Sequence, residues 1–428
     1  MMVTCFRSSP RGMQRCTRFL SPLSKYNYED YMPPTLASVQ HRYTANTQEQ
    51  QHSNSSSILT GLATSHVGLE QNKRHAPMVY HDHYSCPTWP TKHTFPMAKF
   101  TETYNSLLLD NDEFLTGDQQ LVLSKEHLYK PISYNNFPIH TFLSPPLCPN
   151  FLHSFLQGTL TTEECREIGF REQTTRPGLI QRSVLEVAGT ILTCQLAIKY
   201  GLASNLAGGT HHAECNKGKG FTILNDLAIA TRIITWNEEE EDTTTDTNNI
   251  DILRDFYRGD DDAIDRVLVV DCDVHQGDGT ATFTYPGQPL HNKLFTLDLH
   301  AANNYPWPKE RCTYDIGLPD ECNDDQYLDT LESSLDIALT EIIPQLIIYN
   351  AGVDVYHKDK LGRLNISWEG MKQRDLHVIR TCVNRDIPLA CVVGGGYDDD
   401  VKIVGQRHAL VHRVCAQVWR ENKMWQRV

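Results

Sequence analysis

Short apolar runs and longer stretches of helical periodicity alternate along most of this 428-residue chain. Each apolar run has the length of a buried strand, and the stretches between the later runs have the length of ordinary helices. Strands that are separated by helices form a parallel sheet with helices on both faces. The pattern therefore predicts an α/β fold, with strands at 78–80, 267–270, 294–297, 346–349 and 389–393.

The helical stretches carry start and stop signals. The helix expected over 95–109 has Pro96 in its first turn, where a missing amide hydrogen costs little. The helix expected over 179–200 is followed by Gly201, the residue type that often ends a helix. Further helices are expected over 226–236, 326–342 and 368–384.

Acidic and imidazole side chains follow two of the apolar runs. Asp273 and His275 come shortly after the run 267–270, and Asp354 follows the run 346–349. Residues i and i+2 of a strand point the same way, so Asp273 and His275 are expected to converge. Asp354 is expected to reach the same point from a neighbouring strand, because ligands bind beyond the carboxyl ends of such strands. Three such ligands with an open position are typical of a catalytic zinc site, and iron(II) accepts the same ligands.

The first 76 residues differ in composition from the rest of the chain. Residues 1–25 contain five basic and no acidic residues, which fits either an organellar transit peptide or a basic disordered tail. The first alternative places the protein in the mitochondrion or plastid, and the second in the cytoplasm or nucleus. Residues 44–76 are polar and bury too little apolar surface to fold alone. We therefore expect a disordered extension over 1–76 and a folded domain over 77–428.

An acidic insertion, at about 237–263, separates one predicted helix from the next apolar run. Its like charges repel and stay solvated, so an exposed loop is favoured over a docking site for a basic partner. The formal net charge of −14 argues against a generic nucleic-acid-binding surface, which needs a basic footprint. No apolar stretch approaches the roughly 18 residues of a membrane-spanning helix.

The thirteen cysteines include no Cys-x-x-Cys pair, so a structural zinc cluster is not indicated. Cys272 and Cys391 lie in apolar surroundings and are expected to be small buried side chains. This usage of cysteine favours a reducing compartment.

Six short motifs occur in order along the chain, and they are Gly-Gly-Thr-His-His-Ala (208–213), Gly-Phe-Thr-Ile-Leu-Asn-Asp (220–226), Asp-Cys-Asp-Val-His-Gln-Gly-Asp-Gly (271–279), Asp-Leu-His (298–300), Ala-Gly-Val-Asp (351–354) and Gly-Gly-Gly-Tyr (394–397). In order and spacing they resemble the histone deacetylase superfamily, which has the single-domain, three-layer arginase/deacetylase fold. The segments 93–100, 158–170 and 205–213 resemble the class IV and bacterial class-IV-like deacetylases. The resemblance extends from about Met78 to about Trp419.

The resemblance implies roles for five side chains in zinc-dependent amide hydrolysis, besides the three metal ligands. His212 is expected to act as the general base and then as the acid, with His211 as electrostatic support. Asp271 is expected to orient His211, and Asp278 to orient His212. Many class-IV-like sequences have asparagine at the position of Asp278. Tyr397 matches the tyrosine that donates its hydroxyl to the developing oxyanion.

The resemblance also assigns a substrate tunnel and a second ion. Gly220 and Phe221 match the wall that grips the acyl-lysine stem, and Tyr305 is expected on the opposing wall. Asp298 replaces the serine of many relatives beside a structural potassium site. The backbone carbonyls that match this ion site lie around Asp271, Asp273, His275 and Leu299.

Several functions remain open at this level. The leading expectation is zinc-dependent hydrolysis of N-acyl-lysine in a protein, and class IV relatives extend the acyl group to longer fatty chains. Acetylated polyamines or other small acylated amines are alternative substrates. Ureohydrolase activity is disfavoured, because Gly277 stands where the second metal of that family needs an aspartate. A non-catalytic binding module is disfavoured because the ligand and acid–base residues are intact.

Overall fold

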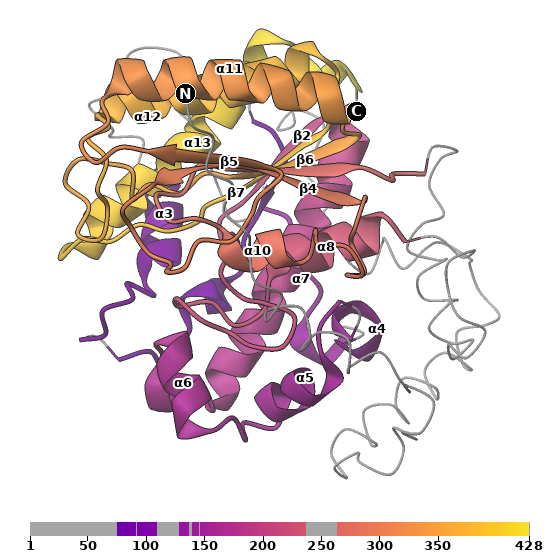
Figure 1. Ribbon diagram of the computed structural model, residues 1–428, viewed down its shortest axis with the longest axis vertical. Coiled ribbons are helices and arrows are strands. Elements are labelled where there is room, and N and C mark those ends of the chain that lie inside the picture. Colours follow the sequence, from indigo (N-terminus) through magenta and orange to yellow (C-terminus); the bar gives the residue numbers. More distant parts are fainter. Residues whose placement is uncertain are drawn as a thin grey trace, which may run out of the picture. The chain divides into compact units, whose positions relative to one another are not determined.

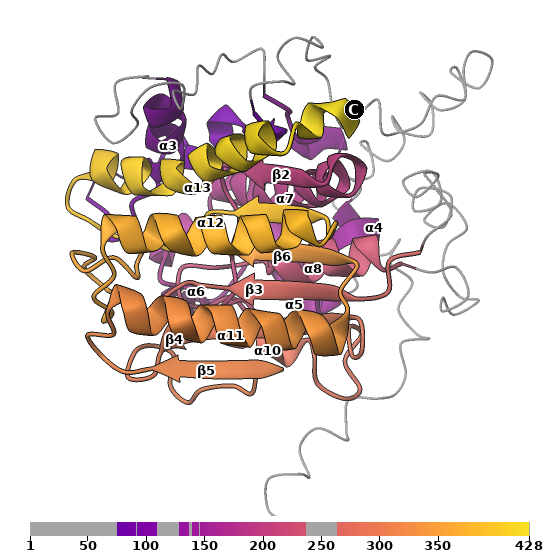
Figure 2. The same cartoon turned by 90° about the horizontal axis from the view of Figure 1, so that it is seen from above.

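The computed structural model describes residues 75–427, apart from 91, 109–127, 137–138, 145 and 237–262. Its centre is a seven-stranded sheet in the order β1-β2-β7-β6-β3-β4-β5, in which every neighbouring pair is parallel (Figure 2). The expected α/β fold with a parallel central sheet is therefore confirmed. The strands are β1 (Met78–Val79), β2 (Leu202–Asn205), β3 (Val267–Asp271), β4 (Leu294–Ala301), β5 (Tyr314–Leu318), β6 (Leu346–Asn350) and β7 (Leu389–Val392).

The described α-helices are α3 (Lys99–Leu108), α4 (Ile139–Leu143), α5 (Pro149–Leu156), α6 (Thr162–Ile168), α7 (Pro177–Tyr200), α8 (Asp226–Ile234), α10 (Asp278–Thr282), α11 (Asp324–Ile342), α12 (Trp368–Asn384) and α13 (Val401–Glu421). Short 3-10 helices span Asp82–Ser85, Tyr134–Asn136, Arg171–Gln173 and Met424–Arg427. Helices α11, α12 and α13 cover one face of the sheet, and α7 and α8 cover the other (Figure 1).

The central strand β3 is apolar on both faces because helices cover both. Its residues point alternately to the two sides of the sheet. Val267 and Val269 belong to the core that includes α7 and α8, whereas Leu268 and Val270 belong to the core that includes α11 and α12. An uninterrupted apolar run is therefore the expected sequence for this strand.

Two strands and one long helix were not predicted from the sequence. The strand β2 has only four residues and ends in Ser204 and Asn205, so it lacks an apolar run. The strand β5 lies at the edge of the sheet and exposes alternate side chains. The helix α13 begins after Asp400, whose side chain accepts a hydrogen bond from the Lys402 amide, and this cap was a usable signal.

The predicted helices agree with the structure to within two residues at their described ends, except at the start of one. The helix α7 ends at Gly201, which adopts a left-handed conformation with φ of 87°. The helix α3 begins at Lys99, four residues later than the expected start at Phe95. Proline disfavours a helical conformation in the residue before it, so Pro96 keeps Phe95 out of the helix.

The predicted extension over 1–76 lies outside the described residues except for its last two positions. The acidic insertion, expected at about 237–263, lies outside them except for its last residue. Among the helices that the structure describes, none has the length and hydropathy of a membrane span. Cys272 and Cys391 are fully buried, as expected.

A buried arginine links the loops that follow β3 and β6. Arg374, on α12, donates hydrogen bonds to the carbonyl oxygens of Cys272 (3.2 Å) and Gly352 (2.6 Å). Its guanidinium pairs with Asp375 at 2.9 Å, and both side chains are about 1% exposed. A buried charge needs such pairing, so Arg374 fixes both loops to the same helix.

A second buried cation lies at the start of α3. Lys99 is 1% exposed, and its Nζ donates to the carbonyl oxygen of Gly394 at 2.8 Å. The ammonium group also lies over the rings of Phe95 and Phe100. Burial lowers the pKa of Lys99 from 10.5 to about 8, although Asp354 attracts the charge. Lys99 therefore costs stability while it holds the loop that contains Gly394.

We predict that Lys99→Met raises the free energy of unfolding of the metal-free protein by about 1–3 kcal/mol at pH 7. Because the pKa of Lys99 is about 8 when folded and near 10.5 when unfolded, the unfolded state binds more protons between these values. The penalty is therefore complete below pH 8 and disappears as pH rises to about 10.5. Urea unfolding at several pH values measures the difference, and a variant less stable than the wild type at pH 7 would contradict the prediction.

Candidate metal centre and active site

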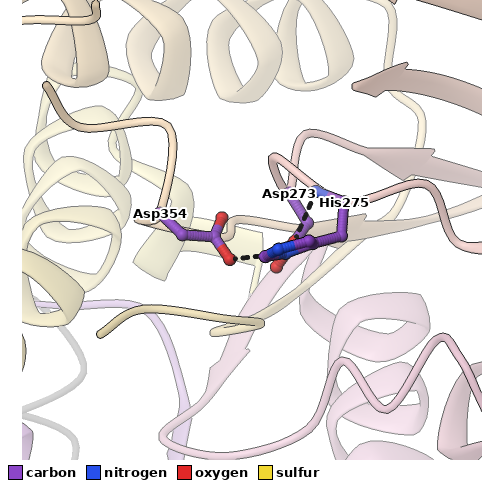
Figure 3. Close-up of side chains that lie close together, drawn as sticks. All are labelled: Asp273, His275 and Asp354. Carbon is purple, nitrogen blue, oxygen red and sulfur yellow. Dashed lines mark hydrogen bonds and ion pairs between the residues drawn. The ribbon is translucent and has the colours of Figure 1, made fainter. Parts of the chain in front are cut away.

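Asp273, His275 and Asp354 lie together beyond the carboxyl ends of β3 and β6 (Figure 3). These two strands are neighbours, with Asp271 in register with Asn350, so the loops that follow them start side by side. His275 Nδ1 lies 3.1 Å from Asp273 Oδ1 and 3.1 Å from Asp354 Oδ2. All three side chains are buried, and their ligand atoms converge on one point.

The local backbone at Asp273 and His275 differs from the expected strand. β3 ends at Asp271, and a tight loop follows it. In this loop the Asp273 amide donates to Asp271 Oδ1 at 3.1 Å, and the His275 amide donates to Asp273 Oδ1 at 3.0 Å. The two side chains therefore converge because carboxylates hold alternate backbone amides of the loop. The expected convergence is found, but strand alternation is not its cause.

The residues of this cluster fit a divalent metal ion. Burial disfavours a charge on His275, yet the hydrogen bonds that its Nδ1 donates to Asp273 and Asp354 outweigh this effect and raise the pKa of His275 to about 9. The two carboxylates thus stabilise a positive charge at the point where all three side chains meet. A metal ion would replace that proton, and two oxygens and one imidazole nitrogen suit zinc or iron(II). We call Asp273, His275 and Asp354 the candidate metal centre.

Glycine 395 allows the backbone to close over the candidate metal centre. Its amide donates to Asp273 Oδ2 at 2.7 Å. A Cβ atom at this position would clash with the carboxylates of Asp354 and Asp273. Glycine is therefore required at position 395 by the close approach of the backbone to these side chains.

The tandem histidines each contact the aspartate that the resemblance assigned to them. His211 Nδ1 lies 2.7 Å from Asp271 Oδ2, and His212 Nδ1 lies 2.8 Å from Asp278 Oδ1. The two imidazole rings are buried, with centroids 4.1 Å apart. In each pair Nδ1 contacts the carboxylate, so Nε2 is left for contacts elsewhere.

The two histidines differ in their affinity for a proton. Burial, together with the charge of the neighbouring His211, lowers the pKa of His212 to about 4. Burial also opposes a charge on His211, but the carboxylates of Asp271 and Asp273 outweigh it and raise its pKa. At neutral pH, His211 therefore carries the positive charge and His212 is neutral.

Tyr397 follows the Gly-Gly-Gly turn and is 8% exposed. Its amide donates to Asp359 Oδ2 at 2.7 Å, which ties the turn to the loop after Asp354. Burial, together with the negative charge of Asp354, raises the pKa of the phenol well above its usual value. The hydroxyl therefore keeps its proton at neutral pH and can donate a hydrogen bond.

A cavity of about 40 Å³ connects most of these groups. Gly220 and Phe221, expected on the tunnel wall, line it. Tyr305 lies at the rim: its ring packs edge-on against His212 with centroids 5.0 Å apart, and it is 38% exposed. Of the described residues that line the cavity, those with candidate roles are His211, His212, Gly220, Phe221, Asp273, His275 and Tyr397.

Asp298, expected beside a potassium ion, is engaged with two groups of the protein. One carboxylate oxygen contacts His300 Nδ1 at 2.7 Å, and the other accepts from the Gly277 amide at 2.7 Å. His300 thus has a structural contact, in keeping with the absence of a catalytic pattern around it. The potassium site stays a prediction.

Sequence reasoning missed several polar residues that complete the site. Asn350, the last residue of β6, donates to Asp271 Oδ1 at 2.9 Å. Asp226 accepts hydrogen bonds from the amides of Gly209 and Thr210, which precede the tandem histidines. Lys219 forms an ion pair with Asp278 at 2.6 Å. Asn350 could have been identified as the polar residue that ends an apolar run, and Asp226 as the polar residue that ends a motif. No local signal marks the pairing of Lys219.

Comparison with known proteins supports this arrangement. A sequence model of the histone deacetylase domain matches residues 148–242 and 247–412. An uncharacterized protein of Picosynechococcus sp. is 39% identical over 343 residues, which is 80% of this chain and 99% of that protein.

Two histone deacetylases are also similar to this chain. Histone deacetylase 2 of Arabidopsis thaliana is 32% identical over 227 residues, 51% of each chain. Histone deacetylase clr6 of Schizosaccharomyces pombe is 26% identical over 208 residues, 46% of this chain and 43% of the other. The alignments thus span about half of each of these two enzymes. With the parallel sheet, the Asp-His-Asp cluster and a domain match over more than half of its length, the chain belongs to the histone deacetylase family.

Proposed function

We propose that this protein hydrolyses N-acyl-lysine amides with zinc as its metal, in the manner of the class IV deacetylases. One observation carries the proposal. One cavity is lined by Asp273 and His275 of the candidate metal centre, by both tandem histidines and by Tyr397. Metal-dependent amide hydrolysis uses these three kinds of group together: an activating ion, a proton carrier and an oxyanion donor.

The candidate metal centre would hold the ion through one imidazole and two carboxylates. When bound, a zinc ion supplies Lewis-acid activation of water and of the amide carbonyl. His212 is the better general base of the two, because its ring is unprotonated at neutral pH and has a nitrogen free to accept a proton, whereas His211 is already charged. It would then donate that proton to the leaving lysine amine.

The remaining groups stabilise developing charge or contact the substrate. His211, held positive by Asp271, stabilises negative charge that develops in the cavity. The Tyr397 hydroxyl keeps its proton and donates to the carbonyl oxygen as it becomes an oxyanion. Phe221 supplies an apolar wall for the methylene stem of the acyl-lysine.

Hydrolysis of a matched panel of acyl-lysine peptides, acetyl through myristoyl, tests the proposal directly. We expect zinc-reconstituted protein to cleave members of this panel, and a hydroxamate chelator to stop the cleavage. Acetylated polyamines in the same assay separate a small-amine substrate from a protein substrate. If no member is cleaved while zinc is bound, the hydrolase proposal fails.

Loss of a ligand should remove the metal. We expect Asp273→Ala or His275→Ala to lower the zinc content of the purified protein to a small fraction of the wild-type value, measured by elemental analysis. His357→Ala is the matched control, since this histidine lies three residues after Asp354 and contacts the Ile366 carbonyl instead. Full zinc retention in either ligand variant would refute the ligand assignment.

Tyr397→Phe should lower kcat by about 10²–10³-fold, because it removes one oxyanion donor. Zinc content should stay at the wild-type level, since the hydroxyl is not a ligand. Tyr285→Phe is the control: it removes a hydroxyl that binds Glu310 outside the cavity lining. Unchanged turnover in Tyr397→Phe would exclude this tyrosine from the reaction.

A further inference from the structure

The aspartate beside His212 has a cationic partner. Lys219 Nζ lies 2.6 Å from Asp278 Oδ2, with the lysine side chain 12% exposed and the aspartate side chain 1% exposed. Lys219 also contacts Glu214 Oε1. Burial lowers the pKa of Lys219, but the hydrogen bonds to Asp278 and Glu214 outweigh it and raise the pKa. The lysine is therefore charged at neutral pH.

Asp278 uses one carboxylate oxygen for each partner. Its Oδ1 faces His212 Nδ1 at 2.8 Å, while its Oδ2 faces Lys219 Nζ. A carboxylate held at both oxygens cannot rotate without breaking a charge-assisted hydrogen bond. Lys219 therefore fixes the orientation in which Asp278 accepts from the imidazole.

The other histidine–aspartate pair is built differently. Asp271 Oδ2 contacts His211, but its Oδ1 accepts from two neutral donors, the Asn350 side chain and the Asp273 amide. Among the residues that the structure describes, His211 itself is the cation that compensates Asp271. This difference matches the charge states of the two imidazoles, because a compensated carboxylate stabilises an imidazolium less than an uncompensated one does.

The direction of the Lys219 side chain is set by the loop that contains this lysine. Gly218 and Gly220 flank it, and the backbone between them is tight, since a Cβ at Gly218 would lie 2.6 Å from the Thr222 carbonyl oxygen. Lys217, two residues earlier, instead pairs with Glu167 near the surface. Only the second lysine of the loop reaches the buried aspartate.

We propose that Lys219 is a positioning residue for amide hydrolysis, which orients the Asp278 carboxylate towards His212 and compensates its charge. The inference rests on the proposed function of His212. The proposal predicts that the residues at positions 278 and 219 depend on each other. Aspartate at 278 should function best with lysine at 219, and asparagine at 278 should function best with a neutral residue at 219. Asparagine at 278 has one acceptor oxygen for two donors, so its amide NH2 group would face either the Lys219 ammonium group or His212 Nδ1. Aspartate without the lysine would remain buried without that compensating charge.

A double-mutant cycle tests the proposal with four proteins: wild type, Lys219→Met, Asp278→Asn and the double variant. We expect each single change to lower kcat by about 10–100-fold with little change in KM, because a misplaced proton carrier slows the chemical step. The double variant should be several-fold more active than either single variant. Lys217→Met is the matched control in the same loop and should leave kcat near the wild-type value.

Urea unfolding shows whether the ion pair between Lys219 and Asp278 exists, independently of whether the proposed function is correct. We expect the urea midpoint of Lys219→Met to fall and the midpoint of the double variant to recover, irrespective of activity. If the unfolding effects simply add, the ion pair is absent in solution and the proposal is overturned. If unfolding shows coupling while the effects on kcat add, Lys219 is structural and the positioning role is refuted. If the wild type cleaves no substrate, the proposed function fails and the positioning role falls with it, whereas the unfolding result still decides the contact.

Discussion

The site depends on the compensation of buried negative charge. Five carboxylates on or just after three neighbouring strands are held almost out of contact with water, where an unpaired charge is costly. Each has a donor or cation of its own: a histidine, an asparagine amide, a lysine or the backbone amides of a tight loop. These five buried carboxylates are Asp271, Asp273, Asp278, Asp298 and Asp354.

The same requirement explains why a metal belongs where Asp273 and Asp354 meet. One carboxylate oxygen of Asp273 and one of Asp354 already contact His275 Nδ1, and the two carboxylates together raise the pKa of that imidazole. A divalent ion compensates two carboxylates where one proton compensates only part of their charge. The local charge thus favours metal binding independently of the reaction that the metal serves.

Much of the fold was predictable because it rests on local patterns. The apolar runs correspond to β1, β3, β4, β6 and β7, because strands covered on both faces must be apolar throughout. The edge strand β5 and the short strand β2 lack such a run, so periodicity did not reveal them. The candidate ligands were identifiable because parallel strands bring their carboxyl ends to one edge of a sheet.

Contacts between distant segments were not predictable in this way. Lys99 and Gly394 are 295 positions apart in the sequence and meet only in the tertiary structure. Lys219 gives no sign in the sequence that it faces Asp278 and not solvent, since Lys217 in the same loop faces outward. Side-chain direction in a glycine-rich loop depends on tertiary packing, which single-sequence periodicity does not contain.

The contacts that hold Tyr397 determine the shortest fragment of the chain in which the proposed site stays complete. The family match begins at residue 148, yet the turn before Tyr397 is held by Lys99 of α3 and by Asp359. The edge strand β1 also precedes the matched region and pairs with β2. A shortened chain that begins at residue 148 would retain every candidate ligand and acid–base residue but would lose Lys99, one of the contacts that hold the turn before Tyr397. The region matched by the family model is therefore narrower than the region that holds the proposed site together.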